Sequence, residues 1–152
     1  KYFTFLSKEE IEVLEKSLLE APEKREAQKA LGREVTTLVH GEAAYKQAVK
    51  ITEALFSGNL SDLTAAEIEQ GFKDVPSFNA TNTEDLNIVD LLVDAKISPS
   101  KRQAREDVTN GAVSINGEKV QDTAYMVGEN DRIESKFVII RRGKKKYTLI
   151  RY

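Results

Sequence analysis

Apolar residues recur at helical spacing through the first half of the chain, and this pattern predicts a series of amphipathic helices. The first helix should begin after Ser7, which forms a capping box with the glutamate three residues later. The second should begin at Pro22, because the first helical position tolerates the missing N–H of proline, and should end at Gly41. Two more are expected at residues 42–57 and 64–70, which gives a bundle of four helices with short loops.

The second half is organised around one stretch, residues 98–120. Ser98 is the expected N-cap of a helix that runs to about Asn110. Asn116 and Gly117 then give the strongest short hairpin signal, because a type I′ turn needs positive φ at both central residues. The stretch therefore predicts a short helix followed directly by a tight hairpin.

A polar connector without periodicity, residues 73–84, separates the two halves. After it, the apolar spacing predicts a helix at residues 86–95, and the C-terminal segment predicts two strands around a turn at Gly143. We therefore predict an α+β protein with three segments, namely a helical bundle domain at 1–78, a linker at 79–84 and a small α+β domain with hairpins at 85–152.

Charge is distributed unevenly along the 152 residues, although the formal net charge is only −2. Residues 1–82 hold 10 Lys and Arg against 14 Asp and Glu, whereas residues 83–152 hold 13 against 11. A polyanion would therefore be met by the C-terminal half. No apolar run is long enough to cross a bilayer, and the absence of cysteine excludes disulfides and thiolate metal sites. We expect a cytoplasmic protein without membrane contact.

Basic residues gather on the elements predicted for residues 98–152, where several cations together would bind phosphates and release condensed counterions. A simpler explanation exists for part of the set, because hairpin tips are solvated and edge strands use lysine to prevent aggregation. The candidate RNA-binding residues are Lys101, Arg102, Arg105, Lys119, Arg141, Arg142, Lys144, Lys145 and Lys146.

A basic helix followed by a tight hairpin resembles the small RNA-binding module named after ribosomal small-subunit protein four. The sequences SKRQARED and NGAVSINGE are similar to the C-terminal domain of bacterial tyrosyl-tRNA synthetases. The resemblance extends over the whole chain. FTFLSKEEIEVLE resembles the point at which that family leaves its catalytic core for the helical anticodon-binding domain, and EAPEKREAQKALGREVTTLVHGEAA is similar to the sequence that follows there. Glu106 and Asp107 depart from generic versions of the module, which are more basic.

The resemblance implies an anticodon-binding domain followed by an S-four-like RNA-binding domain, which together hold the anticodon arm and long variable arm of tyrosine tRNA. In the family, an N-terminal catalytic domain binds the substrates ATP and tyrosine and forms the homodimer. We expect this chain to be a piece of such a ligase that is itself non-catalytic and monomeric. Two alternatives stay open, namely a stand-alone ribosome- or RNA-associated protein with the same module, or a protein-interaction domain.

No catalytic or cofactor site is expected within the chain itself. His40 is the only histidine and lies at a predicted helix end without an evident partner for a metal or a catalytic triad. The segment KISPSK superficially resembles the KMSKS loop of class I synthetases, but proline interrupts it and the HIGH signature is absent. Gly-rich nucleotide-binding loops are absent as well.

Overall fold

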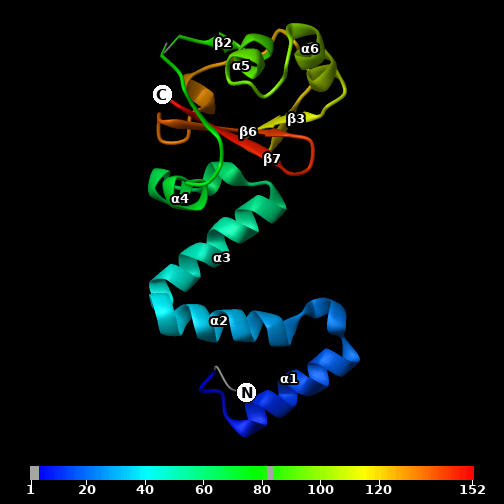
Figure 1. Ribbon diagram of the computed structural model, residues 1–152, viewed down its shortest axis with the longest axis vertical. Coiled ribbons are helices and arrows are strands. Elements are labelled where there is room, and N and C mark those ends of the chain that lie inside the picture. Colours follow the sequence, from blue (N-terminus) through cyan, green and yellow to red (C-terminus); the bar gives the residue numbers. More distant parts are fainter. Residues whose placement is uncertain (1–3, 82–83) are drawn as a thin grey trace. The chain divides into compact units, whose positions relative to one another are not determined.

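The computed structural model describes residues 4–81 and 84–152 and shows a protein of mixed helices and strands. The chain divides into two compact units, Lys1–Lys50 and Ile51–Tyr152. The boundary between them lies inside the helix α3 (Glu42–Ser57), so the predicted third helix contributes to both units (Figure 1).

The first unit contains α1 (Lys8–Glu20), the 3₁₀-helix η1 (Pro22–Lys24) and α2 (Glu26–His40). The capping box predicted at Ser7 is confirmed, since Ser7 Oγ accepts a hydrogen bond from the backbone of Glu10 and the Glu10 carboxylate accepts one from Ser7 N. The predicted start of the second helix at Pro22 is wrong. Arg25 has a φ of 56°, a left-handed conformation that interrupts the helix, so α2 begins only after it.

Helices α1 and α2 bury no side chain among their residues. Several of their apolar residues are largely exposed, among them Leu19 at 85% and Val39 at 65%. Leu18, Leu31, Val35 and Leu38, which the helical spacing places on apolar faces, are also exposed. A bundle of four helices would enclose a shared apolar core. The predicted four-helix bundle is therefore not confirmed.

The second unit is built on a five-stranded sheet with the strand order β1-β7-β6-β3-β4. All neighbouring strands are antiparallel except β1 and β7, which are parallel. The strands are β1 (Ser77–Asn79), β3 (Val113–Ile115), β4 (Glu118–Val120), β6 (Phe137–Arg142) and β7 (Lys146–Arg151). The short strands β2 (Leu86–Asn87) and β5 (Met126–Val127) form a separate antiparallel pair.

One face of the sheet packs on the helices α5 (Ile88–Asp94) and α6 (Lys101–Thr109). The sheet residues Val138, Ile140 and Ile150 share this apolar cluster with α5 and α6. These residues alternate along the strands with others that point to the opposite face, as the pleat of a sheet requires. The helix pair therefore covers only half of the apolar surface that the sheet presents.

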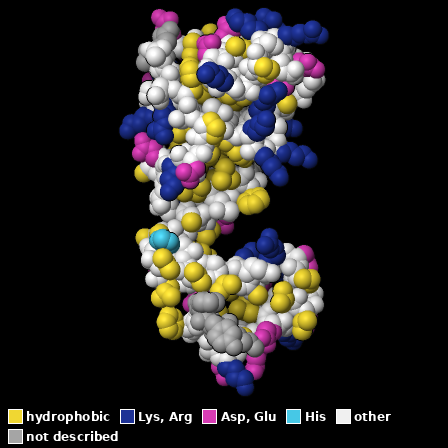
Figure 2. Space-filling model, in the orientation of Figure 1, with side chains coloured by type: hydrophobic (Ala, Val, Ile, Leu, Met, Phe, Trp, Pro, Cys, Tyr) yellow, Lys and Arg dark blue, Asp and Glu magenta, His cyan; other side chains and the backbone are white. Residues whose placement is uncertain are grey.

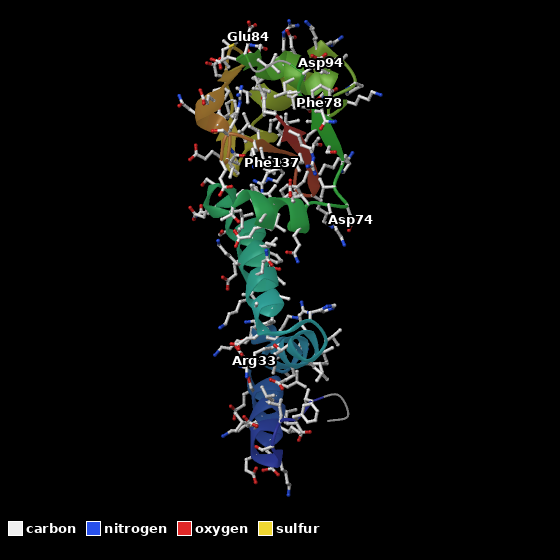
Figure 3. All side chains as sticks on the ribbon, turned by 90° about the vertical axis from the view of Figure 1, so that its left-hand side faces the viewer. Arg33, Asp74, Phe78, Glu84, Asp94 and Phe137 are labelled. Carbon is white, nitrogen blue, oxygen red and sulfur yellow. The ribbon has the colours of Figure 1, made fainter. Side chains whose placement is uncertain are left out.

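The opposite face packs on the end of α3, on the 3₁₀-helix η2 (Leu60–Asp62) and on α4 (Ala65–Gly71). Phe137, Ile139 and Leu149 of the sheet form one cluster with residues of these helices, and Figure 3 labels Phe137 on this side of the sheet. The capping box predicted at Thr64, which begins α4, is confirmed. Residues predicted to belong to a helical domain thus form part of the core around the sheet.

The predicted linker, residues 79–84, begins at the last residue of β1. Its residues 82–83 lie outside the described part of the chain. Strand β1 is not predicted from the sequence, because it has only three residues and pairs with β7, about half of the chain away. The contacts therefore divide the chain at 50/51, because the residues from Ile51 onward are needed to cover the second face of the sheet.

The helix and hairpin predicted for residues 98–120 are present as α6, β3 and β4. The predicted N-cap is wrong, because Ser100 caps α6 by accepting from Gln103 N, whereas Ser98 is buried. The turn is confirmed, with a φ of 49° at Asn116 and 101° at Gly117.

Replacing Ile68 with alanine should destabilise the second unit by about 2–5 kcal/mol, because Ile68 is 0% exposed and lies in the cluster between α4 and the sheet. The matched control is Leu38→Ala in α2, where the side chain is 61% exposed and the change should be close to neutral. The free energy of unfolding of both variants is measured by urea unfolding, with the amide signals of β6 and β7 as the probe. Equal small effects would show that α4 does not support the sheet.

Replacing Gly117 with alanine should cost about 3 kcal/mol of folding free energy, because a Cβ there would overlap the carbonyl oxygen of Gly58 and φ is positive. Gly143→Ala is the control, since its φ is 67° and nothing lies within 4 Å of the added carbon. Strain alone should cost that variant about 1 kcal/mol. Thermal unfolding of the two variants gives the comparison, and similar costs would contradict the close approach at Gly58.

Candidate nucleic-acid interface

Helix α6 presents the three predicted cations on its exposed side. Ala104 and Val108 are fully buried against the core and hold the helix to the sheet. The cations Lys101, Arg102 and Arg105 are exposed, as the helical spacing predicted. Lys101 Nζ lies 2.7 Å from Asp90 Oδ1, which directs the first of these cations toward α5.

The turn between β6 and β7 presents three more exposed cations, which are Lys144, Lys145 and Lys146. Gly143 begins this turn with a φ of 67°. Its N–H donates to the carbonyl of Ala112, at an N···O distance of 2.7 Å, just beyond the C-terminal end of α6. The backbone of the turn is therefore bonded directly to the segment that leaves the basic helix.

Arg142 differs from the other candidates because its guanidinium bonds both to a buried carboxylate and to a backbone carbonyl. Its Nε lies 2.8 Å from Asp107 Oδ2, and its Nη1 donates to the carbonyl of Ile97 at 2.9 Å. The side chain is 25% exposed. Arg142 therefore connects the end of β6 to α6 and to the segment that precedes α6.

Asp107 receives hydrogen bonds from two further donors besides Arg142. Ser98 Oγ donates to Asp107 Oδ2 at 2.9 Å, and Gln103 Nε2 donates to Asp107 Oδ1 at 3.1 Å. Burial opposes ionisation of this carboxyl, but the bonds from Ser98, Gln103 and Arg142 together lower its pKa below the ordinary value. Asp107 is therefore held as a carboxylate beneath the basic face of α6.

Lys119 and Arg141 lie on the opposite face of the sheet from α6. Ser114 pairs with Lys119 on one side and with Arg141 on the other, and Arg141 pairs with Tyr147, so the four residues form one cross-strand row. The neighbouring row contains Val113 and Arg142, which face α6. Arg141 Nη2 also donates to Ser114 Oγ at 3.4 Å.

The structure thus brings together six of the nine predicted residues and separates the others. Figure 2 shows Lys and Arg side chains over the side of the second unit that carries α6 and the turn between β6 and β7. The exposed cations of these two elements are Lys101, Arg102 and Arg105 on α6, Lys144 and Lys145 in the turn, and Lys146 at the start of β7. Lys119 and Arg141 belong to the other face, and Arg142 is held by Asp107.

Two residues that hold this surface in place are not among the predicted site residues. In the sequence, Asp107 is only an acidic departure from the usual module and Ser98 is the expected helix cap, whereas the structure bonds them to each other. The sequence contains a signal, because Asp107 follows Ala104 by three residues and therefore lies on the side of the helix that faces the core. An acidic residue on an apolar helix face indicates a buried partner.

A second polar network lies at the opposite end of the hairpin. Asn116 Oδ1 accepts from Ile139 N at 2.9 Å, and Asn116 Nδ2 donates to the carbonyl of Asp131. Tyr125 Oη donates to Asp131 Oδ1 at 2.6 Å, and this bond raises the pKa of Tyr125 to about 12. These bonds connect the turn of the β3–β4 hairpin to β6 and to the loop that precedes it.

Among the described residues, no group of His, Asp and Glu side chains is placed to hold a metal ion. Within residues 4–81 and 84–152, no helix has the length and apolar character needed to cross a bilayer.

Comparison with known proteins identifies the class of protein to which the chain belongs. Residues 1–57 match a sequence family described as tRNA synthetases class I (W and Y). Residues 67–150 match the tyrosine–tRNA ligase SYY-like C-terminal domain. The chain belongs to the tyrosine–tRNA ligase family.

Individual relatives agree with this assignment. Tyrosine–tRNA ligase 1 of Bacillus cereus is 70% identical over all 152 residues, and tyrosine–tRNA ligase of Geobacillus stearothermophilus is 65% identical. The chain spans 36% of the length of each of these relatives. A solution structure of a tyrosyl-tRNA synthetase C-terminal domain is similar with a TM-score of 0.52 and 60% identity, over 62% of this chain and 94% of that one.

Replacing Asp107 with asparagine should make the free energy of unfolding depend less steeply on pH in the acid range. Because the folded state lowers the pKa of this carboxyl, it contributes stability above its unfolded pKa of about 3.9, which is lost as pH falls through the lower folded value. The unaltered chain should therefore lose more stability than the variant as pH falls from 5 to 2.

The matched control for this experiment is Asp94→Asn, which removes one carboxylate from an exposed position at the end of α5. Urea unfolding at a series of acid pH values gives the free energy of unfolding at each pH. Its slope against pH should be the same for the control as for the unaltered chain. A control that flattens the curve as much as Asp107→Asn would show that overall charge, and not the contacts of Asp107, sets the acid dependence.

Proposed function

We propose that this chain is the tRNA-binding C-terminal region of a bacterial tyrosine–tRNA ligase. The observation that carries the proposal is the shared side of α6 and the β6–β7 turn, where six exposed cations gather on a unit that matches the ligase C-terminal domain. In this function the region holds the anticodon arm and the long variable arm of tyrosine tRNA. Family membership gives no support to the alternative of a protein-interaction domain.

Phosphates are the chemical groups that this surface fits best. Exposed lysine and arginine side chains bind successive phosphates of an RNA backbone, and each neutralised phosphate releases condensed counterions. Such contacts fix position and orientation, whereas discrimination between sequences needs contacts with bases or with RNA shape. Preference for tyrosine tRNA therefore comes from the shape of its long variable arm and from contacts of the helical segment on the anticodon side.

The predicted arrangement of a helical anticodon-binding domain at 1–78 and an S-four-like module at 85–152 belongs to this proposal. Support for the module comes from the order of its elements, since α5 and α6 are followed directly by the hairpin of β3 and β4. Residues 51–75 would then serve both parts, because they belong to the helical segment in sequence and pack on the sheet.

The remainder of the ligase supplies the chemistry in this proposal. ATP and tyrosine are substrates of a catalytic domain outside the 152 residues, and that domain also forms the homodimer. The chain described here binds RNA as a monomer, performs no aminoacylation by itself and needs no cofactor. The complete enzyme acts in the cytoplasm.

Replacing Arg102 and Arg105 together with alanine should weaken binding of tyrosine tRNA and of other RNAs alike. For about five neutralised phosphates, log K should fall against log[salt] with a slope of roughly −3.5 to −4.5, and the double variant should flatten this slope by about 1.5 to 2. Fluorescence anisotropy over a salt series measures both quantities.

The matched control is Lys73→Ala with Lys136→Ala, which removes two exposed cations outside the candidate set. The control should keep the slope of the unaltered chain. If the Arg102 and Arg105 variant folds normally, binds as tightly and keeps the same slope, α6 is not the phosphate-binding helix. If the unaltered chain does not prefer tyrosine tRNA over another tRNA, the ligase-specific function is excluded.

A further inference from the structure

Two groups of exposed cations make up the proposed RNA surface, and they come from segments that are separated in sequence. One group lies on α6 and the other on the turn that joins β6 to β7. Both must be held at a fixed spacing if they are to meet successive phosphates of one backbone, because a loose site loses binding free energy when it is ordered. In the described part of the chain, the side chain of Arg142, at the end of β6, contacts α6 and the segment before it.

We propose that Arg142 is a positioning residue, which holds α6 and the β6–β7 turn as one phosphate-binding surface and does not itself contact RNA. This inference rests on the proposed function, since it names a residue that acts through the proposed RNA contacts. It revises the expectation that all nine basic residues bind phosphates alike.

The geometry of Arg142 supports this role. Its Nε faces Asp107 Oδ2 at 2.8 Å on α6, and its Nη1 donates at 2.9 Å to the carbonyl of Ile97, in the segment that leads into that helix. The next residue, Gly143, begins the lysine-bearing turn and donates from its N–H to Ala112, just after the helix. Both ends of α6 are thereby connected to the start of one turn.

The partner of Arg142 is fixed as firmly as Arg142 itself. Asp107 is 8% exposed and is also bonded by Ser98 and Gln103, so its carboxylate cannot turn away from the core without losing several bonds. An arginine fits this site and a lysine does not, because the planar guanidinium donates in two directions from one rigid group. A lysine keeps the charge but can replace only one of the two contacts.

The decisive comparison uses two neighbouring acids of α6 in the full 152-residue chain. Glu106→Gln and Asp107→Asn each remove one negative charge beside the proposed surface, but Glu106 is exposed whereas Asp107 holds Arg142. Removing a carboxylate should strengthen binding to a polyanion when only charge matters. We expect Glu106→Gln to bind in vitro transcribed tyrosine tRNA slightly more tightly, and Asp107→Asn to bind it about three- to tenfold more weakly.

A second comparison tests Arg142 itself. Arg142→Lys should also bind about three- to tenfold more weakly, and the double variant with Asp107→Asn should be no weaker than the weaker single variant, because both changes break one contact. The control is Arg151→Lys on the neighbouring strand, a partly buried arginine outside the surface. It should bind as the unaltered chain does. Affinities are measured at a temperature at which thermal unfolding shows every variant folded.

Two results would overturn the proposal. The first is Arg142→Lys binding as tightly as the unaltered chain, which would make Arg142 a simple point charge. The second is Asp107→Asn strengthening binding as much as Glu106→Gln. Amide hydrogen exchange without RNA keeps the test independent of the proposed function. Arg142→Lys should raise exchange in residues 97–112 and 142–146 and leave the pairing of β1 with β7 unchanged, whereas unchanged exchange in α6 would show that Arg142 holds nothing in place.

Should Arg142→Lys fail to fold, Gln103→Ala replaces it, since that change removes one of the bonds to Asp107 and leaves the ion pair. It should weaken binding by a smaller factor, about two- to threefold, and no change in either affinity or exchange would count against the proposal. If the unaltered chain binds no tRNA while exchange rises as expected, the proposed function fails and the positioning role of Arg142 stands.

Discussion

Strand β6 is apolar and buried on both faces, and the second unit follows from the need to cover it. Val138 and Ile140 face the helix pair α5 and α6, whereas Phe137 and Ile139 face α4 and the end of α3. A strand of this kind cannot form the surface of a one-sided sheet, because two of its apolar side chains would be left in water. Residues before and after the predicted linker must therefore fold together, and the cations of α6 depend on the same core.

The attraction within a partly buried ion pair is offset to a large extent by the cost of removing two charges from water, but the pair still orients the elements that carry it. Arg142 and Asp107 illustrate the point, since an apolar pair could fill the same space without fixing where α6 ends. The two bonds of the guanidinium define a direction as well as a contact. For a surface that binds regularly spaced phosphates, a fixed orientation of α6 matters more than a small gain in folding stability.

Local patterns were sufficient to predict the elements that depend on neighbours in sequence. The capping boxes at Ser7 and Thr64, the turn at Asn116 and Gly117, and the apolar face of α6 all follow from residues a few positions apart. Contacts across long sequence distances could not be found in this way. The pairing of β1 with β7 joins residues 77–79 to residues 149–151, and no local pattern marks so short a strand.

The same difference between local patterns and long-range contacts applies to the candidate site. The exposure of Lys101, Arg102 and Arg105 could be predicted from helical spacing alone. The separation of Arg141 from Arg142 could not, because adjacent strand residues point to opposite faces and only the register assigns each face a neighbour. Composition therefore identified a basic C-terminal half, but the sheet decided which of its charges act together.

The Asn116-Gly117 dipeptide has a consequence for the deamidation of the protein. Asparagine before glycine is especially prone to deamidation in flexible chains, because the following backbone nitrogen can attack the side-chain carbonyl. Here the side chain of Asn116 is fixed by Ile139 N and by the carbonyl of Asp131, and Gly117 lies against Gly58. Conversion of the amide to a carboxylate would replace the donor that faces the Asp131 carbonyl with a negative oxygen, so the deamidated chain would lose this hydrogen bond in the folded state.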